Sequence, residues 1–208
     1  RVISKISSKV DAIVQTYLPG LFGADALANI LAGEVNPSGK LPYTYPAFPN
    51  SLVPYYHKHS EEQKRSEGVY NYEGDFNPEY HFGYGLSYTT FGYSNLKIDR
   101  TSIGKDSNDD ITISIDVTNT GKVAGKEVVQ LYSSDLYASV IPDTKRLRRF
   151  EKIALNPNET KTVTFKLKTK DLSYIDMNNK RVIEPGDFEL QIGASSNDIK
   201  DKVILTVE

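Results

Sequence analysis

The sequence contains no cysteine and no tryptophan among its 208 residues. Without cysteine the chain has neither a disulfide framework nor a thiolate metal site, and the redox compartment stays open. Without either residue it cannot build a β-sandwich core of the antibody type, in which a tryptophan packs on a disulfide. Structural stabilisation must therefore come from packing, hydrogen bonds and ion pairs.

An excess of charge and long apolar runs are also lacking. The net charge is -2, which gives no basic field for nucleic acid, and no run of about 18 apolar residues predicts a membrane span. The three histidines, His57, His59 and His81, have no fixed spacing, so no metal site is predicted and no cofactor is expected. A chain that is 38% hydrophobic over this length can still bury a sizeable core.

The first third of the sequence has the pattern of an α/β unit. Residues 12–17 form a short apolar run ended by Pro19-Gly20, which predicts a strand buried in a parallel sheet. Residues 24–31 have helical periodicity, and Gly33 stands where a left-handed C-terminal cap is wanted. One such unit cannot cover its own apolar faces, so we expect the chain to be the C-terminal part of a longer polypeptide.

Prolines interrupt the stretch from Asn36 to about Tyr80 and exclude long helices and central strands there. An edge strand is predicted at residues 41–46. The charged stretch at residues 57–68 is predicted to be a solvated loop.

Beyond residue 91 the apolar period changes to two. Alternation is clearest at residues 111–117, 163–167, 188–192 and 203–207, with turn signals between these runs. About seven such strands are typical of an antiparallel β-sandwich of immunoglobulin or fibronectin type III kind. The missing tryptophan and cysteine favour the fibronectin type.

Between these two parts lies the aromatic segment from His81 to Phe91, with Gly83 and Gly85 where the backbone must turn sharply. We therefore predict two domains, residues 1–90 and 91–208. The segment FGYGLSYTTF, together with NPSGKLP at residues 36–42 and VVQLY at residues 128–132, resembles the C-terminal portion of family 3 glycoside hydrolases. The resemblance implies the strand–helix end of an α/β sandwich, followed by an all-β immunoglobulin or fibronectin type III-like sandwich.

Members of that family are retaining exo-acting β-glycosidases, such as β-glucosidases and β-xylosidases, which use two carboxyl groups about 5 to 5.5 Å apart. In the family, the nucleophile lies on an upstream barrel and the acid/base residue lies upstream of residues 12–17, so no catalytic residue is expected in this chain. The resemblance implies the remainder of the glycosidase and a β-linked oligosaccharide as partners. It also favours a periplasmic or secreted location over the cytoplasm, with the compartment left open.

Two residues are predicted to bind substrate: Tyr56 and His57, in a Tyr-Tyr-His-Lys segment that resembles one near the family's catalytic pocket. Four carboxylates lie beside aromatic residues in the linker: Glu67, Glu73, Asp75 and Glu79. Such residues could also serve a sugar site, but the favoured interpretation is a solvated structural loop.

A second charged group surrounds the connection from Ser133 to Phe150, where the family's Ser-Val-Thr-Arg-Pro-like segment is replaced by Ser-Val-Ile-Pro-Asp. The favoured interpretation is that these charged residues form one solvated face of an edge strand. They are Asp135, Asp143, Lys145, Arg146, Arg148 and Arg149. The alternative to an enzyme segment is a non-catalytic module that binds carbohydrate or protein, although no planar row of exposed aromatic residues is evident in the strands.

Overall fold

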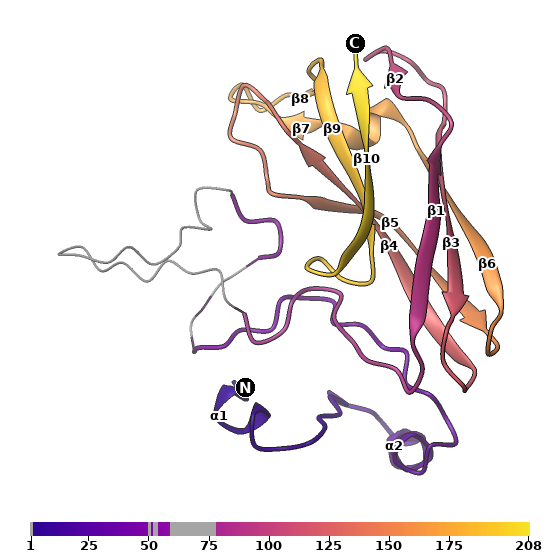
Figure 1. The fold of residues 1–208 in the computed structure, drawn as a ribbon. Helices are drawn as coiled ribbons and strands as arrows, with labels where there is room; N and C mark the ends of the chain where they lie inside the picture. Colours follow the sequence, from indigo (N-terminus) through magenta and orange to yellow (C-terminus); the bar gives the residue numbers. More distant parts are fainter. Residues whose placement is uncertain (1, 50, 52–53, 59–77) are drawn as a thin grey trace, which may run out of the picture.

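The computed structural model describes residues 2–49, 51, 54–58 and 78–208. Two short helices, α1 (Ser4–Ser7) and α2 (Gly23–Leu31), precede an extended linker, and two packed β-sheets follow it (Figure 1). No helix in this described part is long and apolar enough to cross a bilayer.

The first sheet has the strand order β1-β3-β6 and the second has the order β2-β10-β9-β4-β5. All strand pairs in them are antiparallel except β2 with β10. The strands are β1 (Phe91–Ile98), β2 (Ser102–Ile103), β3 (Ile111–Asn119), β4 (Gly125–Asp135), β5 (Arg146–Leu155), β6 (Thr160–Leu167), β9 (Gly186–Gly193) and β10 (Ile199–Val207). Between β6 and β9 lie a 3-10 helix, η2 (Thr169–Leu172), and the hairpin of β7 (Tyr174–Ile175) and β8 (Arg181–Val182). The predicted β-sandwich is confirmed.

The sandwich core follows from strand alternation. In β3, Ile111, Ile113, Ile115 and Val117 are fully buried, while the residues between them are partly exposed. They join a single cluster with apolar residues of β4, β6, β9 and β10. Each such side chain stabilises the fold by about 1.5–3 kcal/mol relative to exposure, so the cluster holds the two sheets together.

Strand β4 departs from alternation because both of its faces are buried. Val129 and Leu131 face the core, while Gln130 and Tyr132 are also buried. The covering residues come from before the sandwich: the Tyr55 ring lies edge-on to Tyr132 at 6.2 Å, and the Gln130 side-chain nitrogen donates to Gly83 O at 3.3 Å. The linker therefore packs on the outer face of the five-stranded sheet.

Within the linker, residues 41–45 run antiparallel to residues 79–84. Leu41 N donates to Tyr84 O at 2.9 Å, Gly83 N donates to Leu41 O at 2.8 Å, and Tyr45 N donates to Tyr80 O at 2.8 Å. The edge strand predicted at residues 41–46 is thus reduced to an isolated bridge between Tyr45 and Tyr80. The two extended segments support each other beside the sandwich.

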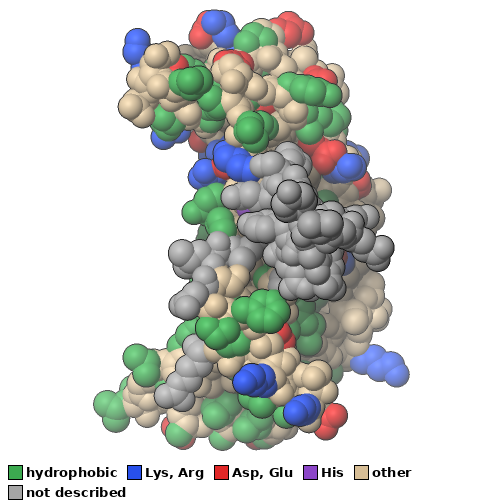
Figure 2. Space-filling view, turned by 90° about the vertical axis from the view of Figure 1, so that its left-hand side faces the viewer, with side chains coloured by type: hydrophobic (Ala, Val, Ile, Leu, Met, Phe, Trp, Pro, Cys, Tyr) green, Lys and Arg blue, Asp and Glu red, His purple; other side chains and the backbone are tan. Residues whose placement is uncertain are grey.

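The strand predicted at residues 12–17 is wrong for this chain: these residues are irregular and exposed. A parallel strand needs neighbouring strands for its backbone hydrogen bonds, and the described residues supply none there. The predicted helix at residues 24–31 is present as α2, and Gly33 has the predicted left-handed conformation, with φ of 78°. Leu18 is 97% exposed and Leu21 is 96% exposed, and hydrophobic side chains gather at this end of the molecule (Figure 2).

A buried ion pair joins the linker to the sandwich. Lys40 Nζ lies 3.3 Å from Glu127 Oε1 and donates to Gly85 O at 2.9 Å, while the Tyr93 hydroxyl donates to Glu127 at 3.2 Å. Burial outweighs these favourable contacts and raises the pKa of Glu127 above its ordinary value. The carboxylate therefore depends on Lys40 to stay charged.

We predict that Lys40→Met destabilises the chain by about 3 kcal/mol, because it leaves a buried carboxylate without its cation. The pKa of Glu127 should rise further in this variant, so its stability should fall as pH rises through that raised value. Denaturant unfolding at pH 5 and pH 8 should show the larger defect at pH 8. Lys122→Met, at an exposed lysine, is the control; an equal defect at both pH values would contradict the prediction.

We also predict that Gly83→Ala destabilises the chain by about 1–3 kcal/mol. Gly83 has φ of 80°, and an added Cβ would lie 2.2 Å from Gln130 Oε1, so both backbone and packing resist it. Gly104→Ala is the matched control, since its Cβ would meet no atom within 4 Å. Thermal unfolding of the two variants should separate them, and an equal loss in both would exclude a special role for Gly83.

Candidate functional site

Residues 54–58 form a short segment that lies against the start of β5. Lys58 and Asp143 form an isolated antiparallel bridge, and Thr144 N donates to His57 O at 2.9 Å. Leu147 N donates to the Tyr55 hydroxyl at 3.2 Å, and the Tyr55 ring stacks on Phe82 with centroids 4.2 Å apart. These contacts fix the segment to the edge of the five-stranded sheet.

The two predicted substrate-binding residues lie in this segment but differ in environment. His57 is 6% exposed, and its Nδ1 lies 3.1 Å from Pro54 O. Tyr56 is 41% exposed, and the Arg146 guanidinium lies 4.7 Å from its ring centroid, a cation–π contact. The structure thus leaves the Tyr56 ring accessible beside the basic residues of β5, and the substrate role of both residues stays a prediction.

The other histidines have different surroundings. Burial, with the nearby positive charge of Lys145, lowers the pKa of His81, so its imidazole is neutral at pH 7. His59 lies outside the described residues. The described part of the chain holds no group of three histidine or acidic side chains arranged for a metal ion.

Of the acidic candidates in the linker, Glu67, Glu73 and Asp75 lie outside the described residues. Glu79 is described, and its backbone N–H donates to Tyr45 O at 2.9 Å. Its position beside the Tyr45–Tyr80 bridge anchors the linker backbone.

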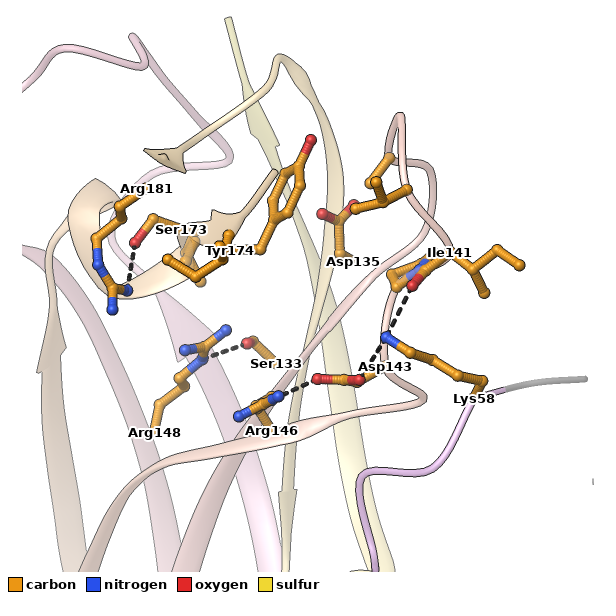
Figure 3. A pocket seen from close by; sticks show the side chains of 15 residues that line it. Lys58, Ser133, Asp135, Ile141, Asp143, Arg146, Arg148, Ser173, Tyr174 and Arg181 are labelled. Carbon is orange, nitrogen blue, oxygen red and sulfur yellow. Dashed lines mark hydrogen bonds and ion pairs between the residues drawn. The ribbon is translucent and has the colours of Figure 1, made fainter. Parts of the chain in front are cut away.

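The charged residues predicted around the connection from Ser133 to Phe150 divide into two sets. Asp135, Asp143, Arg146 and Arg148 line a cavity of about 300 Å³ (Figure 3). Arg149 instead pairs with Asp171 at 2.6 Å. Lys145 Nζ donates to Ser196 O at 3.0 Å. Strand β5 is an edge strand, as expected, but its basic side chains do not form one solvated face.

Strand β5 is irregular at this point. Arg149 pairs with Leu131 and Leu147 pairs with Tyr132, so Arg148 is an extra residue on β5. Such an irregularity bends a strand locally. Arg148 is half-buried, and its Nε donates to Ser133 Oγ at 2.7 Å.

The charges around the cavity are unevenly paired. Asp143 accepts from Lys58 Nζ at 2.7 Å and also pairs with Arg146. No carboxylate of the described residues lies within ion-pair distance of Arg148. Burial and repulsion by Arg146 lower the pKa of Arg148, although a guanidinium stays protonated in proteins.

The opposite wall of the cavity was not predicted from the sequence. It comes from the segment that ends η2 and forms the β7–β8 hairpin, where Arg181 Nη1 lies 3.2 Å from Ser173 Oγ and the Tyr174 hydroxyl lies 2.9 Å from Ser139 Oγ. These residues are about 40 positions from Ser133 in the sequence and have no distinctive motif. Only the fold brings them to β5.

Two family profiles match the chain. The glycosyl hydrolase family 3 C-terminal domain matches residues 1–88, and a fibronectin type III-like domain matches residues 127–196. Together they cover the linker with its preceding helices and the part of the sandwich from β4 to β9.

Individual relatives agree with these profiles. A β-xylosidase of Formosa agariphila is 43% identical over 208 residues, which are 99% of this chain and 28% of the relative. A lysosomal β-glucosidase of Dictyostelium discoideum is 41% identical over 191 residues, which are 88% of this chain and 22% of the relative. The chain therefore spans only about a quarter of the length of these curated relatives.

Solved structures of β-glucosidases are also similar to this chain. The β-glucosidase of Listeria innocua in complex with glucose superposes with a TM-score of 0.88 at 30% identity, over 99% of this chain and 29% of that one. The β-D-glucoside glucohydrolase of Trichoderma reesei superposes with a TM-score of 0.78 at 32% identity. The chain belongs to glycoside hydrolase family 3, of which it contains C-terminal domain sequence followed by a fibronectin type III-like sandwich.

Proposed function

We propose that this chain is the C-terminal segment of a retaining, exo-acting β-glycosidase that releases terminal β-linked glucose or a related sugar. One observation carries the proposal: β-xylosidases and β-glucosidases match the chain over nearly its whole length, while the chain spans only about a quarter of theirs. The catalytic carboxylates are proposed to lie upstream of this chain. Its own part is to complete the α/β sandwich domain and to hold the linker in place.

The exposed end of the molecule supports a polypeptide partner. Leu18, Leu21 and Phe22 are almost fully exposed, and Leu31 is two-thirds exposed on α2. Apolar side chains that gather in this way mark contact surfaces. We propose that the upstream part of the glycosidase covers them and supplies the neighbouring strands that residues 12–17 lack.

We predict that the chain alone does not hydrolyse 4-nitrophenyl β-glucoside or β-xyloside. When the missing upstream part of the Formosa agariphila β-xylosidase is added as a second chain, or fused before Arg1, hydrolysis should appear. Leu21→Asp should abolish reconstitution, because it places a charge in the proposed contact surface. Release of 4-nitrophenol is the measurement.

The control for this prediction is Met177→Asp, at a residue that is 86% exposed on the sandwich and outside the proposed surface. It should reconstitute as well as the unaltered chain. Hydrolysis by the chain alone above a heat-denatured sample would contradict the proposal, as would equal reconstitution by Leu21→Asp.

A second prediction concerns Tyr56 and His57 as substrate-binding residues. In the reconstituted enzyme, Tyr56→Phe should raise KM several-fold with little change in kcat, because it removes a hydroxyl that binds ground state and transition state alike. The ring above Arg146 is retained in this variant. His57→Gln should act in the same direction, and circular dichroism should show whether the buried site still folds.

Tyr137→Phe is the matched control, since Tyr137 is 80% exposed on the sandwich. If KM for the Tyr56 and His57 variants equals that of this control, neither residue binds substrate.

A further inference from the structure

The cavity beside β5 has walls from three separate parts of the chain. The floor comes from β4 and β5, one wall comes from the loop at residues 136–143, and the other comes from the β7–β8 hairpin region (Figure 3). Lys58 lies at its edge, hydrogen-bonded to Ile141 O at 2.8 Å. Hydrogen bonds between Tyr174 and Ser139 and from Arg181 to Ser173 hold the walls in place.

The described residues that line the cavity carry more positive than negative charge. Among them are four cationic side chains, against the carboxylates of Asp135 and Asp143. Asp143 is engaged by Lys58 and Arg146, and the Asp135 carboxylate accepts from Tyr137 N at 3.2 Å. Burial raises the pKa of Asp135, which opposes its negative charge. The two remaining cations, Arg148 and Arg181, have no ion pair with the described residues.

Arg148 is the central group of the cavity. Its Nε is used in the hydrogen bond to the buried Ser133, which fixes the plane of the guanidinium and leaves its two terminal nitrogens without a hydrogen bond to the described residues. Asp171 and Asp143 attract the half-buried guanidinium only from beyond ion-pair distance, so an anion that enters the cavity offsets part of its desolvation cost. The planar guanidinium fork matches the two oxygens of a carboxylate.

The other lining groups suit a sugar. The hydroxyls of Ser133, Ser173 and Tyr174 line the cavity, and the Tyr174 ring gives it an apolar wall. A volume of about 300 Å³ is at the small end of ligand pockets, which fits one monosaccharide rather than a long oligosaccharide.

We propose that this cavity binds a sugar acid, with its carboxylate held by Arg148 and Arg181 and its hydroxyls held by Ser133, Ser173 and Tyr174. The carboxylate part of this inference depends on the unpaired guanidinium groups alone. The choice of a sugar rests on the proposed function as well. The site lies on the sandwich and contains neither of the proposed substrate-binding residues.

The test is a titration of the ¹⁵N-labelled chain, followed by heteronuclear NMR, with D-glucuronate, D-glucose and inorganic phosphate. Glucuronate should give saturable shifts at the amides of Ser133, Ser173 and Tyr174, glucose should give none, and phosphate should bind more weakly than glucuronate. Arg148→Gln should weaken glucuronate binding at least ~10-fold, as expected for the loss of a charge-assisted hydrogen-bond pair.

Arg181→Gln should also weaken glucuronate binding, and it serves as a second variant because Arg181 is exposed and its loss spares the β4–β5 packing. Arg149→Gln is the matched control: it removes the same charge from the next residue of β5, outside the cavity, and should leave binding unchanged.

Absence of saturable glucuronate shifts would overturn the proposal. So would binding of phosphate or glucose as tight as that of glucuronate, or unaltered binding in both cavity variants. The titration involves no hydrolysis, so its failure is distinguishable from failure of the reconstitution assay.

Discussion

Burial of both faces of β4 is the constraint on which the packing of the linker against the sandwich depends. The inner face joins the apolar core, but the outer face carries Gln130 and Tyr132, whose polar groups need partners once water is excluded. The Gln130 amide nitrogen donates to Gly83 O and to Ala194 O at 2.6 Å, and the Tyr132 hydroxyl donates to Gln130. Gly83 O of the linker is one of these partners, so the outer face of the sheet helps to determine where the linker lies.

Polar groups at the ends of the linker also have hydrogen-bond partners. Asn36 Oδ1 accepts from Ser87 Oγ and from Tyr88 N, while its Nδ2 donates to Ala124 O at 3.0 Å on the turn before β4. Lys40 reaches Glu127 close by. Polar contacts therefore attach Asn36 and Lys40 to the sandwich, whereas residues 18–31 expose apolar surface. The chain is held to the sandwich after α2, while α2 and the residues just before it leave apolar area uncovered.

A structural feature could be predicted from the sequence where it is determined by a few adjacent residues. Alternation in β3 and the glycine after α2 were sufficient, because the period of two and the left-handed cap are properties of a few adjacent residues. The strand predicted at residues 12–17 is not formed, because the described residues supply no hydrogen-bond partners for it. Burial of the outer face of β4 could also have been predicted. The run from Val128 to Ser134 lacks the alternation of apolar and polar residues, and such a run is typical of a strand that is covered on both sides.

The candidate sites show a further limit. The sequence identified Tyr56 and the arginines of β5 as candidate site residues. It did not show which ion pairs they form: Asp143 pairs with Lys58 and Arg146, while Arg149 pairs with Asp171. Strand β5 also contains one extra residue, and no local pattern marks where a strand takes an irregularity. Successive strand residues point to opposite faces, and Arg148 lines the cavity while Arg149 pairs with Asp171. The basic residues of β5 are therefore shared between the cavity and an ion pair outside it, and only the folded positions of Asp143 and Asp171 show which arginine each carboxylate takes.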